Sequence, residues 1–270
     1  MEIIGYLASL IIGISLGLIG GGGSILTVPV LVYLMGVEPV LATAYSLFIV
    51  GSTSLVGALP KYKQGLVNLK TAIIFGAPSI LAVFATRKYI IPMIPNEVFT
   101  IGGFMVTKSI LMMVLFAILM VFASISMIRT QKKPAENGNG EQKFNYPLIL
   151  LEGTIVGLLT GLVGAGGGFL IIPALVLLSK LPMKQAVGTS LLIIAAKSLI
   201  GFTGDLSHTK MDWKLLLIVT ALAIVGIFIG DKMSKKIDGD KLKKGFGWFV
   251  LVMGIYIIVQ QLFFPLGGGH

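Results

Sequence analysis

Two glycine-rich stretches carry the most distinctive chemistry that the residue types of this chain allow. The first is GLIGGGGSILTVP at residues 17–29, and the second is GLVGAGGGFLIIP at residues 161–173, 144 residues later. Glycine costs about 1 kcal/mol relative to alanine in a helix, so four in a row predict that one helix stops at Gly20 and another starts near Ser24. The free N–H groups and the positive dipole end at such a break suit an anion.

The composition says where these breaks must lie. Of the 270 residues, 56% are hydrophobic and 12% are charged, and the mean hydropathy is +0.98. A soluble domain of this length could not bury so many apolar side chains, so we expect an all-α polytopic membrane protein surrounded by the lipid bilayer. Irregular backbone at membrane depth survives only inside protein or beside a water-filled cavity. The glycine breaks are therefore expected within the helix bundle.

Several other kinds of chemistry are excluded by the residues themselves. There is no cysteine, and His208 is the one histidine outside the last five residues, so no transition-metal constellation or disulfide framework is expected. Neither GxxxxGK[ST] nor a GxGxxG after a strand is present, which excludes an ATPase. The net charge of +10 comes from cations in short loops between apolar segments, so it indicates membrane topology and not a nucleic-acid partner. We expect no cofactor and no metal.

The apolar segments that must position the breaks occur as two sets of five. The first set is residues 3–19, 25–35, 39–59, 69–91 and 108–128, and the second is 147–163, 169–179, 183–203, 213–230 and 244–264. Identical residues recur in register over some fifty positions, which indicates duplication. We assign residues 1–130 to repeat 1, 131–145 to a polar linker, 146–265 to repeat 2 and 266–270 to the remnant of a purification tag.

The second segment of each set is too short to span a membrane. Eleven residues cover about half of a hydrocarbon core near 30 Å thick. The first two segments can therefore form one broken span, a re-entrant hairpin or two separate crossings. If they return to their starting side, fifteen of the 21 basic residues share one face and five lie on the other, with Lys197 left inside the bundle. This asymmetry predicts two inverted repeats, a cytoplasmic linker and both termini outside.

Polar residues within the apolar segments are further candidates. Lys197 could be a counter-charge for an anion or a proton-linked group, or it could extend to the nearest segment end. Thr43, Ser46, Thr189 and Ser190 are spaced so that they could line a path, although each could instead bond to its own helix. A hydrolase that uses Ser190 with Lys197 as base is an alternative.

Other small and polar residues have structural explanations. Small residues spaced four apart, at Ser9, Gly13 and Gly17 and again at residues 153, 157 and 161, predict close helix packing. Asn68 and Asp212 each precede an apolar segment and are predicted to cap a helix.

The two glycine stretches, together with EPVLATAYSL and MKQAVGTSL, resemble the sulfite exporter TauE/SafE family of membrane permeases over nearly the whole chain. The resemblance implies a duplicated helical transporter for small sulfur-containing anions such as sulfite, sulfoacetate or related sulfonates. Tyr45, where the second repeat has Thr189, and Ala165, which interrupts the glycine run, are departures from symmetry. The implied substrate-binding residues are Gly20, Gly21, Gly22, Gly23, Ser24, Gly164, Ala165, Gly166, Gly167 and Gly168, beside Thr43, Ser46, Thr189 and Ser190.

The expected function is therefore a secondary transporter, an exporter of such anions in the inner cell membrane. Its partners would be a small anionic substrate and a coupling proton or sodium ion, and the sequence predicts no particular oligomeric state. Alternating access would come from rocking one repeat against the other, with Lys197 supplying charge. A passive anion channel is the alternative within membrane proteins.

Overall fold

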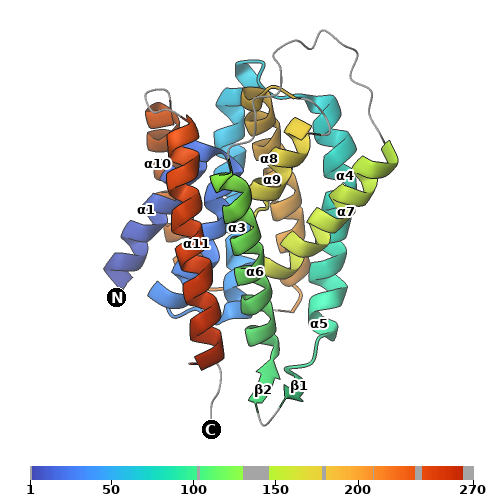
Figure 1. Cartoon of the computed structure of the whole chain (residues 1–270), viewed down its shortest axis with the longest axis vertical. Coiled ribbons are helices and arrows are strands. Elements are labelled where there is room, and N and C mark those ends of the chain that lie inside the picture. The colour runs from blue at the N-terminus through green and yellow to red at the C-terminus, as the bar shows by residue number, and fades with distance from the viewer. Residues whose placement is uncertain are drawn as a thin grey trace.

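A computed structural model of the chain describes residues 2–101, 104–129, 146–177, 181–208, 210–234 and 239–263. They form a bundle of helices with one two-stranded sheet at its lower end (Figure 1). The linker predicted at residues 131–145 and the tag remnant predicted at 266–270 lie outside the described residues.

Each predicted apolar segment corresponds to helical structure with ends within about five residues of those expected. The elements of the first half are α1 (Glu2–Ile19), η1 (Gly21–Leu26), α2 (Thr27–Pro29), η2 (Val30–Leu34), α3 (Pro39–Lys63), α4 (Leu69–Ala85), η3 (Thr86–Ile90), α5 (Ile91–Met93), β1 (Glu97–Ile101), β2 (Phe104–Thr107) and α6 (Lys108–Ile128). Those of the second half are α7 (Tyr146–Val163), α8 (Gly168–Leu177), α9 (Met183–Asp205), α10 (Trp213–Ser234) and α11 (Gly239–Phe263). The antiparallel hairpin of β1 and β2 was not predicted.

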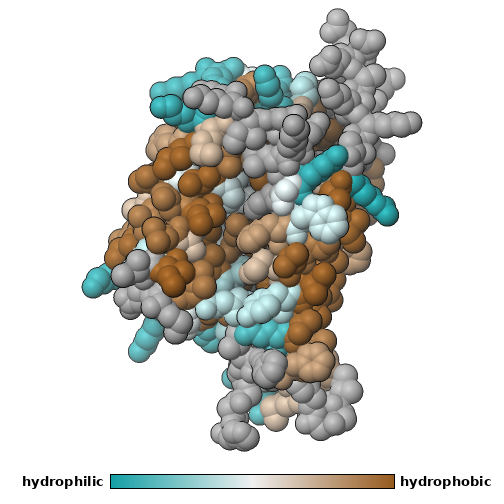
Figure 2. Space-filling view, turned by 60° about the vertical axis from the view of Figure 1, so that its left-hand side comes forward, coloured by the Kyte–Doolittle hydropathy of each residue, from teal (hydrophilic) through white to brown (hydrophobic). Residues whose placement is uncertain are grey.

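The long helices have the length and composition of membrane spans. Among the described residues, five helical stretches are long and apolar enough to cross a membrane: α3, α4 continued through α5, α6, α9 and α10. Figure 2 shows hydrophobic residues over the middle of one face and hydrophilic residues above them. The chain is thus an all-α polytopic membrane protein, as its composition predicts.

The first two segments of each half form a re-entrant hairpin, one of the three arrangements considered. In the first half Gly5 lies beside Met35, and Gly23 lies beside Ser15 and Leu16, so the chain returns to the end where α1 begins. In the second half α7 descends from the upper end and α8 turns back toward it (Figure 1). The two hairpins enter from opposite ends of the bundle, which makes the repeats inverted.

The packing of the helices repeats itself at the 144-residue displacement. Gly57 of α3 packs against Ile227 of α10, and its counterpart Gly201 of α9 packs against Val83 of α4, the counterpart of Ile227. The principal helix pairs are α1 with α10, α7 with α4, α3 with α9 and α6 with α11. Each of these pairs joins an element of one repeat to an element of the other.

The small residues of the hairpin helices allow this close approach. Gly13 and Gly17 of α1 lie against the backbone of α10, where a Cβ on Gly226 would be 2.9 Å from the Gly13 Cα and one on Gly230 would be 3.0 Å from the Gly17 Cα. Gly153 and Gly157 of α7 lie in the same way against the backbone of α4, and Gly161 lies against the side chain of Thr86 at the start of η3. Helix packing, the structural explanation of this spacing, is confirmed.

Candidate anion-binding site

The first glycine break is tighter than expected. Helix α1 ends at Ile19, Gly20 adopts a φ of 74°, and residues 21–26 form the 3₁₀-helix η1. The prediction that the glycine run would not be helical is therefore wrong for residues 21–23. Gly23 packs so closely on Ser15 and Leu16 of α1 that a Cβ would have no room, and the 3₁₀ turns use backbone groups that would otherwise lack partners.

The second glycine break is open, as expected. Residues 164–167 lie between the two helices, and α8 begins at Gly168, after the Gly167 carbonyl, which accepts from the Leu170 and Ile171 amides. The Gly164 amide donates to the Thr160 carbonyl oxygen at 3.0 Å. Among the described residues, the amides of Ala165, Gly166 and Gly167 donate to no backbone acceptor. This turn offers free N–H groups at the N-terminus of a ten-residue apolar helix, which is the arrangement that suits an anion.

The two breaks meet where α3 crosses α9. Gly166 lies against Val50 of α3 and its counterpart Ile194 of α9, and a Cβ on Gly166 would be 3.1 Å from the Cβ of Ser24 in the first break. The remaining glycines extend this symmetry, because Gly20 packs against Val187, and Gly164 packs against Thr43, which is the counterpart of Val187. Ser24 is fully buried, so the meeting point is inside the bundle.

Lys197 stands beside the open turn. Its side chain is 0% exposed, which excludes an extended side chain that reaches a helix end. Its Nζ donates to Thr160 Oγ1 at 2.9 Å, and a Cβ on Gly167 would lie 2.7 Å from that nitrogen. An ammonium has three donors, so Lys197 can bond to Thr160 and to an anion on the turn at once. The counterpart position in α3 is Thr53, so only the second break has a cation of this kind.

The predicted hydroxyl groups differ in whether they already have a hydrogen-bond partner. Ser46 is buried and, within the described part of the chain, its Oγ has no hydrogen-bond partner. Thr43 donates to the Val40 carbonyl and accepts from Arg87. Ser190 donates to the Val187 carbonyl of its own helix. No hydrogen bond joins Ser190 to Lys197, so the pairing that a hydrolase would need is not formed here.

Thr189 has a structural partner. Its Oγ1 accepts from the Asn68 amide at 2.9 Å, and at the equivalent place the Tyr45 hydroxyl accepts from the Asp212 amide at 2.6 Å. Tyr45 and Thr189 therefore have the same structural role, although the residue types differ. Thr189 holds the start of α4, and Tyr45 holds the start of α10. Asn68 and Asp212 also cap these helices by accepting from Thr71 and Leu215 amides, which confirms the predicted caps.

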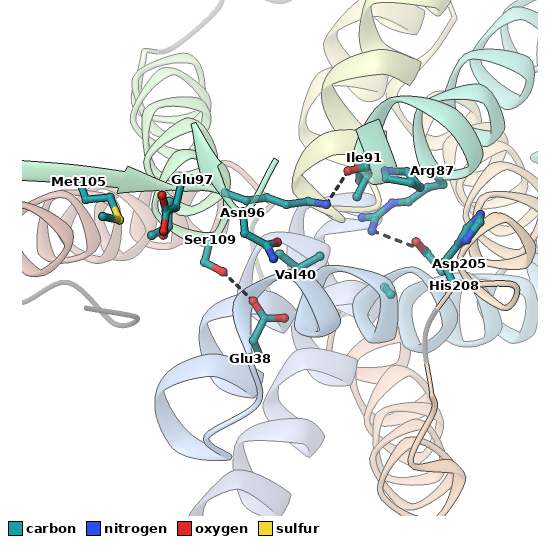
Figure 3. Close-up of a pocket in the computed structure, with 14 residues that line it drawn as sticks. Glu38, Val40, Arg87, Ile91, Asn96, Glu97, Met105, Ser109, Asp205 and His208 are labelled. Carbon is teal, nitrogen blue, oxygen red and sulfur yellow. Dashed lines mark hydrogen bonds and ion pairs between the residues drawn. The ribbon is translucent and has the colours of Figure 1, made fainter. Parts of the chain in front are cut away.

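Sequence reasoning missed a buried arginine. Arg87, in η3, is 1% exposed and lies 3.4 Å from Asp205, measured from Nη1 to Oδ2, while the same nitrogen donates to Thr43 Oγ1 at 2.9 Å. Arg87 and Asp205 line a cavity of about 680 Å³ at the lower end of the bundle, together with Lys108 and His208 (Figure 3).

The opposite end of the bundle carries the equivalent pair with its charges exchanged. Lys61 lies 2.6 Å from Asp231, and positions 61 and 231 are the counterparts of 205 and 87. The hollow beside this pair measures only about 20 Å³. A comparison of the repeats for complementary charge, rather than identity, would have found both pairs.

The comparisons with known proteins concern nearly the whole chain. Residues 5–257 match the model of the family described as "Sulfite exporter TauE/SafE". A "Probable membrane transporter protein" of Xylella fastidiosa is 29% identical over 255 residues, which cover 92% of this chain and 91% of the relative.

Two further relatives carry the same kind of description. YunE of Bacillus subtilis is 29% identical over 269 residues, covering 93% of this chain and 92% of the relative. MJ0441 of Methanocaldococcus jannaschii is 35% identical over 117 residues, covering 41% and 44%. Both are described as probable membrane transporter proteins. No solved structure matches the chain.

Proposed function

Since this chain belongs to the sulfite exporter TauE/SafE family of membrane transporters, we propose that it is a secondary transporter that carries a small sulfur-containing oxyanion by alternating access. The anion binds where the two glycine breaks meet. The amides of residues 165–167 replace part of its hydration shell, and Lys197 supplies the opposing charge.

One observation carries this proposal. The open turn of residues 164–167 is buried between α3 and α9, its amides donate to no described backbone acceptor, and the Lys197 ammonium lies beside it. A buried cation without a carboxylate partner in a membrane protein favours a function in binding or transport over a structural one. Among the described residues, the hydrogen-bond partner of Lys197 is the neutral hydroxyl of Thr160.

The unequal ends of the bundle favour a transporter over a channel. A channel needs a path from both ends, whereas here one end has a cavity of about 680 Å³ and the other a hollow of about 20 Å³, which holds at most one water molecule. Inverted repeats can exchange their conformations, and that exchange would close the first end and open the second.

The basic residues give the orientation that we propose. Lys61, Lys63, Arg129, Lys184 and Lys232 lie at helix ends on the side of the closed hollow. The positive-inside bias places that side in the cytoplasm of a bacterial-type cell membrane, with the linker. The cavity then faces outward, as in one half of an export cycle.

Flux in proteoliposomes tests the proposal. The purified chain is reconstituted, and uptake of radiolabelled sulfite and sulfoacetate is followed under an imposed pH gradient and, separately, a sodium gradient. Accumulation of either anion above its external concentration supports gradient-driven transport. Equilibration without accumulation under both gradients would identify a channel, and no flux of either anion would contradict the substrate class.

A further inference from the structure

The guanidinium of Arg87 is buried at the floor of the cavity with only part of its bonding capacity used. Its Nη1 serves both Thr43 and Asp205, whereas Nε and Nη2 have no hydrogen-bond partner among the described residues. Buried charged donors are costly to leave unpaired. The Nε–Nη2 edge of a guanidinium is also the edge that holds two oxygens of one oxyanion side by side.

The existing acidic partner holds Arg87 weakly. The Nη1 to Oδ2 distance of 3.4 Å exceeds the 2.7–2.9 Å usual for a charge-assisted hydrogen bond, and the equivalent Lys61–Asp231 pair is at 2.6 Å. Asp205 is therefore a partner that an arriving anion can replace.

The charges of the cavity are arranged unevenly. Figure 3 shows Arg87, Asp205 and His208 together at one end, and Glu97 and Met105 at the other. Glu38 is already used, because its two oxygens accept from the Leu41 amide and the Ser109 hydroxyl. Glu97 thus lies at the end of the cavity away from Arg87, which we call the outer end, and Asp205 is the carboxylate beside Arg87 at the inner end.

The inner end also leads to the glycine turn. Arg87 donates to Thr43 Oγ1, and the backbone of Thr43 is in contact with Gly164, the first residue of the open break. A volume of about 680 Å³ is within the usual range of small-molecule sites, so it accommodates an oxyanion with a short organic substituent.

We propose that this cavity is a second anion site, in which the Nε and Nη2 of Arg87 hold a small oxyanion that displaces Asp205 before the anion reaches the glycine turn. The inference rests on the proposed transport function, but its own content is binding at Arg87. It applies equally to an inorganic sulfur oxyanion and to a short sulfonate, and the experiment separates the two.

Protection of a single cysteine from labelling tests this site. Because the chain has no cysteine, Val40→Cys places one thiol on the cavity wall at a half-buried position. We expect sulfate, sulfite or sulfoacetate to slow its reaction with a membrane-impermeant maleimide. Protection by sulfate and sulfite alone would identify an inorganic ligand, protection by sulfoacetate a sulfonate, and both outcomes support the site. No protection by any of the three would contradict it.

Four substitutions in that background assign the protection to Arg87. Arg87→Gln and Arg87→Lys should each raise the anion concentration needed for protection by about tenfold or more, because either loses the guanidinium edge. Asp205→Asn, which removes the competing carboxylate, should lower it severalfold. Asp231→Asn, the matched control at the other end, should change it by less than about twofold, because it shifts only a minor population toward the state open at the upper end. Unchanged protection in Arg87→Lys, the variant that keeps the buried charge, would overturn the proposal even if Arg87→Gln failed to fold.

Failure of this inference can be told apart from failure of the proposed function. Gly166→Val should obstruct the glycine turn, so it should stop uptake while protection at the cavity remains. Loss of protection in Gly166→Val would mean that the anion binds only at the turn, which contradicts a second site. Normal protection with normal uptake in Gly166→Val would contradict the proposed turn and leave the Arg87 site standing.

Discussion

The two ends of the bundle are built from equivalent residues, yet they differ in charge order and in openness. At the lower end η3, which continues α4, supplies the cation Arg87 and α9 supplies the carboxylate Asp205, whereas at the upper end α3 supplies Lys61 and α10 supplies Asp231. The lower pair is longer and borders a large cavity, and the upper pair is short and borders almost none.

The two repeats thus have an ion pair at equivalent positions, but the positive and negative side chains are exchanged between those positions. An ion pair of this kind holds its two helices together, and a motion that separates the helices must break it. A pair at each end, one at 2.6 Å and one at 3.4 Å, is consistent with the alternating access proposed above. The centre is equally uneven, because Lys197 has Thr53 as its counterpart and the second break alone is open.

The largest effect is expected where the two glycine breaks meet, midway between the two ends of the bundle. A Cβ on Gly166 would lie 2.9 Å from Ile194 Cγ2 and would also meet Val50, so Gly166→Val should reduce anion uptake to the level of empty liposomes. Gly245→Ala is the control, since no atom lies within 4 Å of an added Cβ there, and it should transport normally. Uptake is compared per amount of monodisperse protein, and normal uptake by Gly166→Val would remove the turn from the path.

A strong but smaller effect is expected from removing the charge of Lys197, whose counterpart in the first repeat is the neutral Thr53. Lys197→Met keeps the length of the buried side chain and removes its charge, so uptake at low anion concentration should fall about tenfold to a hundredfold. Thr53→Val at the counterpart position should change uptake little, because the Thr53 hydroxyl has no hydrogen-bond partner among the described residues. Equal losses in the two variants would mean that the repeats contribute alike to the site.

The difference in openness can be measured directly. Single cysteines are introduced at Val40, on the wall of the lower cavity, and at Val187, which lines the upper hollow; both positions are half-buried. If the state open at the upper end is populated at about a tenth or less, Val187→Cys should react with impermeant maleimide at least about tenfold more slowly than Val40→Cys. Similar rates at both positions in detergent would contradict a one-sided structure.

The upper ion pair should account for a modest part of the difference in labelling rate between the two ends. Both of its side chains are partly exposed, at 18% and 26%, so the pair is worth at most about 1 kcal/mol, a factor of about five in population. Asp231→Asn should therefore raise labelling at Val187→Cys a few-fold, whereas Asp205→Asn should not. The idea that the upper pair keeps that end closed fails if Asp231→Asn leaves the labelling rate unchanged.

The smallest effects should come from the equivalent hydroxyl anchors. Thr189→Ala and Tyr45→Phe each remove one hydrogen bond to a helix N-terminus, and each should lower the free energy of unfolding by about 1 kcal/mol. The apparent affinity for the anion should stay constant in both, as measured in the flux assay. A selective loss of affinity in Thr189→Ala would return Thr189 to the binding site.

Much of the fold could be predicted from the sequence because apolar length and glycine position are local signals. The span of residues 108–128 and the place of both breaks follow from them directly. The 3₁₀-helix through residues 21–23 could not be predicted, because it depends on the close packing of Gly23 against α1. Arg87 was overlooked as a candidate for a similar reason, since its burial depends on α9 and α3, which are distant in sequence.

The glycine contacts between α1 and α10, and between α7 and α4, have a mechanical consequence. Each hairpin is fastened, backbone against backbone, to a helix inherited by the other copy of the ancestral gene. A motion that parted the two copies would have to separate these tightly fitted surfaces first. In the alternating-access cycle proposed above, the blocks that slide past one another would therefore be hybrids, each assembled from both copies, and the ancestral seam would not coincide with the working hinge.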